Sequence, residues 1–196
     1  MKAARVKGLD PELSLADNAA LIVATRADEL ARLAAEAIAE HDPLALHNTR
    51  IAAKRLRYAL ELTGFCFGPF AAKTARRARA IQDVLGEIHD CDVLLPRIDA
   101  HVARLRQSDA EAAAERRDGT AADDDVAWQV AEELPHSGAY AGLEKLALYV
   151  AARREILYAQ FLDLWARLES EGFRDRLDLA LEQRRGSAEP DVKAVA

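Results

Sequence analysis

The sequence has few of the residues that build turns and sheets. Its 196 residues include 9 Gly and 6 Pro, and aromatic side chains make up only 6%. No segment alternates polar and apolar residues with a period of two, so we predict no β-sheet. Hydrophobic residues still make up 51% of the chain, mostly as alanine and leucine, which favour helix. We therefore predict an all-α protein, long enough for one well-buried domain.

Cysteines and long apolar runs are also scarce. The chain has two cysteines, Cys66 and Cys91, which predicts buried free thiols in a reducing compartment and no disulfide framework. The first 13 residues have no apolar core of the kind that a signal peptide needs. No apolar run approaches the roughly 20 residues of a membrane-spanning helix. We therefore predict a cytoplasmic protein that does not contact a membrane.

Positive charge is concentrated in one segment of an acidic chain. The net charge is −6, but residues 43–80 hold eight Lys and Arg and a single acid, Glu61. This segment therefore carries +7, and the rest of the chain carries −13. Such a segment predicts an anion-binding surface within surroundings that repel non-specific polyanions.

Helix start and stop signals divide the chain into segments. The clearest is Asp42-Pro43, with Asp as the N-cap and Pro at the first helical position, and Gly64 is a plausible stop for that helix. A second start is Gly68-Pro69, and we expect Gly86 to interrupt the helix that follows. The predicted helices are residues 15–40, 43–63, 69–85, 90–107 with a kink near Pro96, a short one at 126–134, 142–170, and a last one ending near 185.

These helices predict a single domain over residues 1–196. Its first helical half spans about residues 15–107, and an acidic linker spans about 108–139. The second, divergent half spans about 140–186, followed by a frayed tail at 187–196.

The helix predicted from residue 43 carries its cations in one stripe. His47, Arg50, Lys54 and Arg57 fall within about 80° of arc along roughly 15 Å of helix. Apolar residues flank this stripe on both sides, namely Leu44, Ile51, Tyr58 and Leu62 on one and Leu46, Ala53, Leu56 and Leu60 on the other. We therefore expect the helix to pack against two neighbours, with its cations between them. Buried like charges are costly unless an anion neutralises them, and a stripe of this length suits a chain of phosphates.

Cations also stand where core residues are expected in other helices. Arg26 lies on the apolar face of the 15–40 helix, whereas Glu29 is assigned to its outer face. Arg153 lies on the apolar face of the 142–170 helix. The helix from residue 69 adds three cations on one arc, Lys73, Arg76 and Arg77. Together they indicate a shared polar interior, although long Arg and Lys stems can also cover apolar surface and extend their charges to water.

The motifs resemble the CHAD family, the conserved histidine α-helical domain. The family's helix, His-x-x-Arg-x-x-x-(Lys/Arg)-Arg-x-Arg, is matched by His47, Arg50, Lys54, Arg55 and Arg57. A second block of the form Leu-Gly-Glu-x-x-Asp-x-Asp-Val-Leu is matched over residues 85–94, in the expected order and separation. A third, weaker block runs from residue 153 to 165. The resemblance covers about residues 15–170.

The resemblance implies two pseudo-repeated helical halves around a basic central channel that binds inorganic polyphosphate without catalysis. It implies no cofactor, no metal and no catalytic residue. The expected binding residues are His47, Arg50, Lys54, Arg55 and Arg57, supported by Lys73, Arg76, Arg77, Arg153 and Arg154, with Arg26 added from its helical position. Polyphosphate granules or polyphosphate-metabolising enzymes are the expected partners. The second half departs from the family pattern, because it has no second His-x-x-Arg helix.

Three other interpretations are open from the sequence. A metal-dependent phosphohydrolase of the HD type would use His47, the pair His89-Asp90, and Asp124 or Asp163 as ligands. Against it, we read Asp90 as a helix cap, and the cations beside His47 would repel a metal ion. Nucleic-acid binding is disfavoured because no aromatic platform for bases is interleaved with the cations. The third is a helical scaffold whose charged interior is internally paired.

Overall fold

The computed structural model describes residues 2–117 and 134–186, which form five α-helices and one 3₁₀ helix and no strand. The elements are α1 (Leu15–Glu40), α2 (Pro43–Thr63), η1 (Gly64–Cys66), α3 (Pro69–Arg117), α5 (Tyr140–Ser170) and α6 (Phe173–Gly186). The predicted all-α class is confirmed. The described chain divides into two compact units, one of residues 2–89 and 157–186 and the other of residues 90–117 and 134–156.

Side-chain caps set the starts of the first two helices. The Ser14 hydroxyl accepts a hydrogen bond from the Asp17 amide at the start of α1. The Asp42 carboxylate accepts two amides of the first turn of α2, and Pro43 occupies the first helical position. These contacts satisfy donors that a helix start otherwise leaves unpaired. Both starts are confirmed, and α2 ends at Thr63 as predicted.

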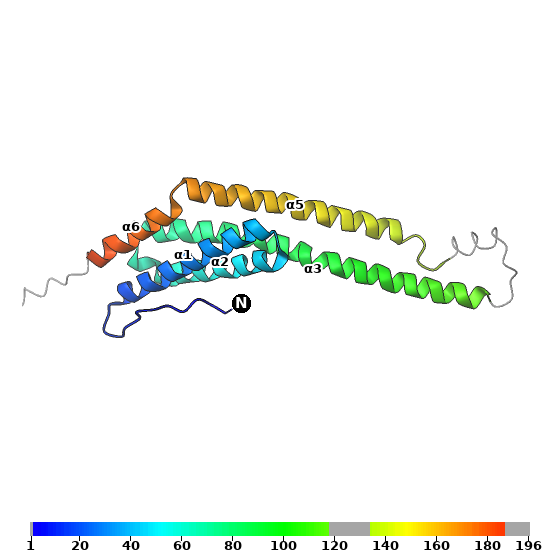
Figure 1. Ribbon diagram of the computed structural model, residues 1–196, viewed down its shortest axis with the longest axis horizontal. Coiled ribbons are helices and arrows are strands. Elements are labelled where there is room, and N and C mark those ends of the chain that lie inside the picture. The colour runs from blue at the N-terminus through cyan, green and yellow to red at the C-terminus, as the bar shows by residue number, and fades with distance from the viewer. Residues whose placement is uncertain (1, 118–133, 187–196) are drawn as a thin grey trace, which may run out of the picture. The chain divides into compact units, whose positions relative to one another are not determined.

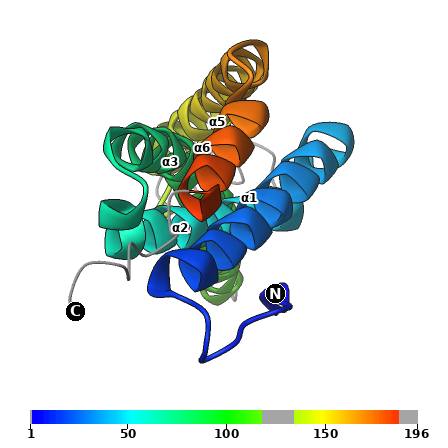
Figure 2. The same cartoon turned by 90° about the vertical axis from the view of Figure 1, so that its left-hand side faces the viewer.

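The first unit is a bundle in which α1, α2 and the first part of α3 run side by side (Figures 1 and 2). α1 packs against α2 and α6. The predicted inner face of α1 is buried, and so are Leu46 and Leu56 of α2, Ile81 of α3 and Phe161 of α5. The buried Thr49 hydroxyl donates to the Leu33 carbonyl at 2.9 Å, which joins α2 to α1 inside this core.

The predicted interruption of the helix after residue 85 is wrong. Gly86, Asp90 and Pro96 all lie inside α3, which continues past the predicted end near residue 107 to Arg117. A glycine inside a helix costs only about 1 kcal/mol, so packing can outweigh it. Asp90 is therefore an exposed helical residue and not a cap. The short helix predicted from residue 126 lies outside the described residues.

The second unit pairs the later part of α3 with the earlier part of α5. The buried Asp109 carboxylate accepts the Tyr140 hydroxyl at 2.6 Å and the His136 amide at 3.2 Å. The hydrogen bond to Asp109 raises the pKa of the Tyr140 phenol above its ordinary value. At the other end of the unit, the Arg154 Nε donates to Asp92 at 2.6 Å. These two contacts set the register of the pair.

In the part of the chain that the structure describes, both cysteines are free thiols, with Cys91 buried and Cys66 half-buried. None of the described helices combines the length and apolar character that crossing a bilayer requires.

Candidate functional site between α2 and α3

The predicted basic stripe lies along one edge of the buried face of α2. The flank formed by Leu46, Ala53, Leu56 and Leu60 is buried, as predicted. The other flank is not, because Leu44, Tyr58 and Leu62 are all exposed. The expectation that α2 packs on both sides of the stripe is therefore wrong. Instead, α2 packs against its neighbours through one broad buried face, and the basic stripe runs along the edge of that face.

The first part of α3 forms a wall opposite this stripe. The rings of His47 and His89 lie 4.7 Å apart between centroids. One turn along, a Cβ added to Gly86 would stand 3.4 Å from the Arg50 Nε, so Arg50 packs directly against this turn of α3. Gln82 and Arg79 lie one and two turns earlier on the same face of α3. We call this set the α2–α3 seam: His47, Arg50, Lys54 and Arg57 of α2, and Arg79, Gln82, Gly86 and His89 of α3.

Several buried polar atoms of the seam have no hydrogen-bond partner among the described residues. They are the His47 Nδ1, the Arg50 Nε, the Arg57 Nε and the Gln82 Oε1. Leaving such an atom unpaired costs about 1–3 kcal/mol, and more where the group is charged. A ligand rich in acceptor oxygens would satisfy the nitrogen donors from outside the chain.

Arg57 is held in place and is only partly neutralised. Its side chain is only 11% exposed, and its Nε lies 3.6 Å from the Glu61 Oε1, an ion-pair distance but too long for a hydrogen bond. Its guanidinium lies over the Tyr58 ring at 4.5 Å from the centroid, and the Lys54 ammonium lies 5.7 Å from the same ring. These cation–π contacts orient both cations, and Glu61 offsets the Arg57 charge only in part.

His47 is electrostatically poised for an anion. Burial lowers the pKa of its imidazole, and the nearby charges of His89 and Arg50 lower it further. The imidazole is therefore neutral near pH 7. An anion in the seam would oppose this effect and favour the protonated form.

Two predicted binding residues are paired inside the bundle. The Glu29 carboxylate accepts the Arg26 Nη1 at 2.5 Å and the Arg55 Nη1 at 2.9 Å. It also accepts the Ala4 amide at 3.1 Å. Glu29 is only 4% exposed, so its assignment to the outer face of the first helix is wrong. It is buried because the N-terminal segment and α2 both cover that side of α1.

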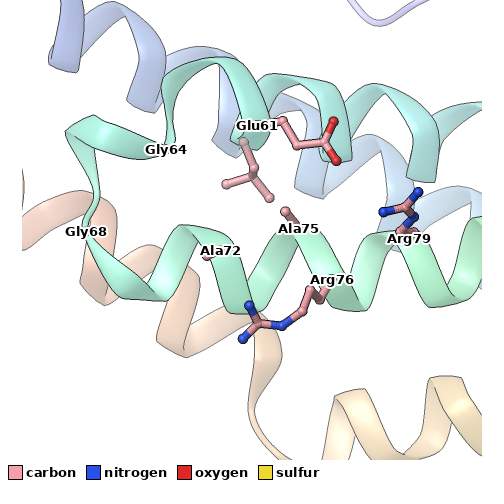
Figure 3. A pocket seen from close by; sticks show the side chains of 8 residues that line it. Glu61, Gly64, Gly68, Ala72, Ala75, Arg76 and Arg79 are labelled. Atoms are coloured by element: carbon pink, nitrogen blue, oxygen red, sulfur yellow. The ribbon is translucent and has the colours of Figure 1, made fainter.

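The remaining predicted cations lie elsewhere. Arg77 forms an ion pair with Glu171, whereas Lys73 and Arg76 are exposed. Arg76 and Arg79 line a pocket of about 370 Å³ beside Glu61, at the α2–η1–α3 turn (Figure 3). Arg153 and Arg154 belong to the second unit, where Arg154 binds Asp92.

Three members of the seam are not among the binding residues predicted from the sequence. Arg79, Gln82 and His89 follow one another at helical spacing through Gly86, which was a usable signal. The predicted break at Gly86 and cap at Asp90 concealed it, because they placed His89 at a helix boundary. Once α3 is continuous, all three fall on the face that meets α2.

Metal ligands are not grouped in the described part of the chain. No three His, Cys, Asp or Glu side chains there lie together as a metal site requires. Asp92 lies inside α3 and accepts a hydrogen bond from Arg154. One of the aspartates considered for an HD-type site, Asp124, lies outside the described residues.

Comparison with known proteins gives one match. The sequence model of the CHAD domain matches residues 2–99, which is half of the chain and includes α1, α2 and the seam. No curated protein and no solved structure matches the chain.

Proposed function

The chain belongs to the CHAD domain family, and on this basis we propose that it binds inorganic polyphosphate along the α2–α3 seam without catalysing a reaction of it. One observation carries the proposal. The side-chain nitrogens of His47, Arg50 and Arg57 are buried along one line and lack hydrogen-bond partners in the described chain. Polyphosphate supplies both the negative charge and the acceptor oxygens that these groups need.

The dimensions of the seam favour a chain of phosphates over a single phosphate. From His47 to Arg57 the helix rises roughly 15 Å, and cations recur at each turn. A polymer of repeating anionic units can contact all of them at once. Nucleic acid fits less well, because Tyr58 is the aromatic ring beside the stripe and its face is covered by Arg57 and Lys54.

The structure divides the expected binding residues into two groups. We propose His47, Arg50, Lys54 and Arg57 as the principal contacts, with Arg79, Gln82 and His89 facing them and Arg76 beside the turn. Arg26, Arg55, Arg77 and Arg154 already have carboxylate partners that lie closer than the 3.6 Å between the Arg57 Nε and the Glu61 Oε1. In this proposal, these four residues contribute only through the local positive potential, as do Lys73 and Arg153. The proposed cellular partners are polyphosphate granules or polyphosphate-metabolising enzymes.

The proposal is tested by fluorescence anisotropy with labelled long-chain polyphosphate at about 150 mM salt, since polyanion affinities depend steeply on salt. We expect the labelled polyphosphate to bind saturably. Excess long-chain polyphosphate should displace it, whereas orthophosphate or single-stranded DNA should displace it only weakly. Equal displacement by DNA would show a generic anion site, and no binding would contradict the proposal.

The residue assignment is tested by the triple variant Arg50→Ala, Lys54→Ala, Arg57→Ala. Each charge-assisted contact contributes about 1.5–3 kcal/mol where it is desolvated, so we expect polyphosphate affinity to fall by several orders of magnitude. Folding should survive, because the variant removes unpaired buried nitrogens and like-charge repulsion. The matched control replaces three exposed arginines of α3, Arg97, Arg104 and Arg106, with alanine and should change affinity little. Affinity retained in the first variant would place the site elsewhere.

A further inference from the structure

One end of the seam carries an acid. Glu61 is the single acidic residue between positions 43 and 80. It lies one turn after Arg57 on α2 and lines the pocket that Arg76 and Arg79 also line. In Figure 3, Glu61 extends from α2 over Ala75, and Arg79 points from α3 towards α2. Arg57 therefore has a carboxylate beside it at this end of the seam, and Arg79 lines the same pocket as that carboxylate.

The contact between Glu61 and Arg57 is attractive but incomplete. The carboxylate stays 3.6 Å from the Arg57 Nε, which remains without a hydrogen bond in the described chain. Glu61 is 46% exposed, whereas Arg57 is 11% exposed. The carboxylate can therefore swing into water, but the guanidinium is confined to the seam. Such a geometry suits a partner that is displaced when a better acceptor arrives.

We propose that Glu61 is a built-in competitor for the seam and sets its selectivity for long polyanions over small ones. A phosphate that reaches Arg57 or Arg79 must displace the carboxylate or lie beside its negative charge. A long chain offsets this cost with contacts at His47 and Arg50, but a single phosphate cannot. This inference rests on the proposed function, because it concerns how the same site discriminates among anions.

The test compares Glu61→Gln with a matched control, Glu36→Gln. Both glutamates form an ion pair with an arginine one turn earlier, and they are exposed to nearly the same extent, 46% and 45%. Both substitutions remove one negative charge, but Glu36 lies on α1 outside the seam. The dissociation constants of polyphosphate and orthophosphate are measured for wild type and both variants by titration at about 150 mM salt, with chelator present.

We expect Glu61→Gln to bind polyphosphate about threefold to tenfold more tightly than wild type, and Glu36→Gln to stay within about twofold. The preference for polyphosphate over orthophosphate should shrink in Glu61→Gln. The salt dependence should also steepen, because Arg57 becomes free to contact phosphate. Glu61→Ala should behave like Glu61→Gln, which separates loss of the charge from any effect of the new amide.

Two failures are distinguishable. If wild type binds polyphosphate tightly and the Glu61 variants match Glu36→Gln, the competitor role is wrong and the proposed function stands. If wild type does not bind polyphosphate, the proposed function itself fails, and this inference fails with it.

Discussion

Arg55 and Arg57 stand two positions apart on α2 and have opposite surroundings. The Arg55 guanidinium donates to the buried Glu29 at 2.9 Å, whereas the Arg57 Nε has no hydrogen-bond partner in the described chain. Both match the same family motif, and both are expected ligands from the sequence. Helical spacing predicts the direction of each side chain from the helix axis. It does not predict a carboxylate on a neighbouring helix, and that carboxylate decides which cation is available to a ligand.

The lowered pKa of His47 predicts that polyphosphate binding depends on pH. A buried imidazole with a lowered pKa takes up its proton at a lower pH than in the unfolded chain, so free-protein stability should fall as the pH drops below 6.5. A bound polyanion favours the proton, so affinity for polyphosphate should rise from about pH 7.5 to pH 5.5. The measurement is the dissociation constant against pH.

The controls for this pH profile are two substitutions. His47→Gln should flatten the rise. His101→Gln should leave it unchanged, because His101 is exposed and lies outside the seam. A profile that is flat in wild type would mean that no phosphate comes near His47.

At the level of helices, the sequence predicts starts better than interruptions. Asp42-Pro43 and Gly68-Pro69 mark the starts of α2 and α3 because capping is local chemistry between neighbouring residues. Gly86 and Pro96 look like interruptions for equally local reasons, yet α3 continues through both. At Gly86 the environment is tertiary, because Arg50 of another helix packs against it, with its Nε 3.4 Å from where a Cβ would stand. No local pattern carries that information.

Gly86→Ala should separate stability from binding. Alanine improves helix propensity by about 1 kcal/mol, and the new Cβ would stand 3.4 Å from the Arg50 Nε, where a flexible side chain can shift. We expect the free energy of unfolding to rise by about 0.5–1 kcal/mol and the affinity for polyphosphate to fall severalfold. Chemical denaturation and anisotropy measure the two quantities.

The matched control is Gly142→Ala in α5, where the added Cβ meets nothing within 4 Å. It should raise stability without changing affinity. A Gly86→Ala variant with unchanged affinity would show that the position of Arg50 is not critical for binding.

For the molecule as a whole, the sequence predicts the class and the first part of the chain well, and the later part less well. The predicted inner face of α1 is buried, and all described elements are helical. In α5, however, Leu146 is exposed, while Phe161 and Trp165 are buried. Periodicity predicts a single preferred face for a helix. Along α5, however, the packing partners change, because its earlier part belongs to one unit and its later part to the other. A single stripe could not describe both environments.

Glu29 holds three segments of the first unit together, so its loss should destabilise that unit. It binds Arg26 of α1, Arg55 of α2 and the Ala4 amide of the N-terminal segment. We expect Glu29→Gln to lower the free energy of unfolding by about 2–4 kcal/mol, because two cations lose their buried partner. Glu36→Gln, which breaks an exposed pair, should cost less than about 0.5 kcal/mol.

The same ion pairs give this effect a pH dependence. Burial alone would raise the pKa of Glu29, but Arg26, the Ala4 amide and Arg55 together lower it. A carboxyl whose pKa is lowered by folding stabilises the fold at pH values above its pKa in the unfolded chain. This stabilisation is lost as the pH falls through the pKa of the folded state. The difference between wild type and Glu29→Gln should therefore shrink below about pH 4.5, as urea titrations at several pH values would show. A constant difference would place the cause in packing and not in charge.

Both walls of the seam come from one continuous stretch of chain, because only η1 and a short turn separate α2 from α3. Bringing them together requires closing a small loop, and that event is fast and entropically inexpensive. The docking of α6 on α1, by contrast, joins residues far apart in the chain, so we expect it to form later in folding. During synthesis, the proposed binding surface can thus assemble while the C-terminal helices are still being made.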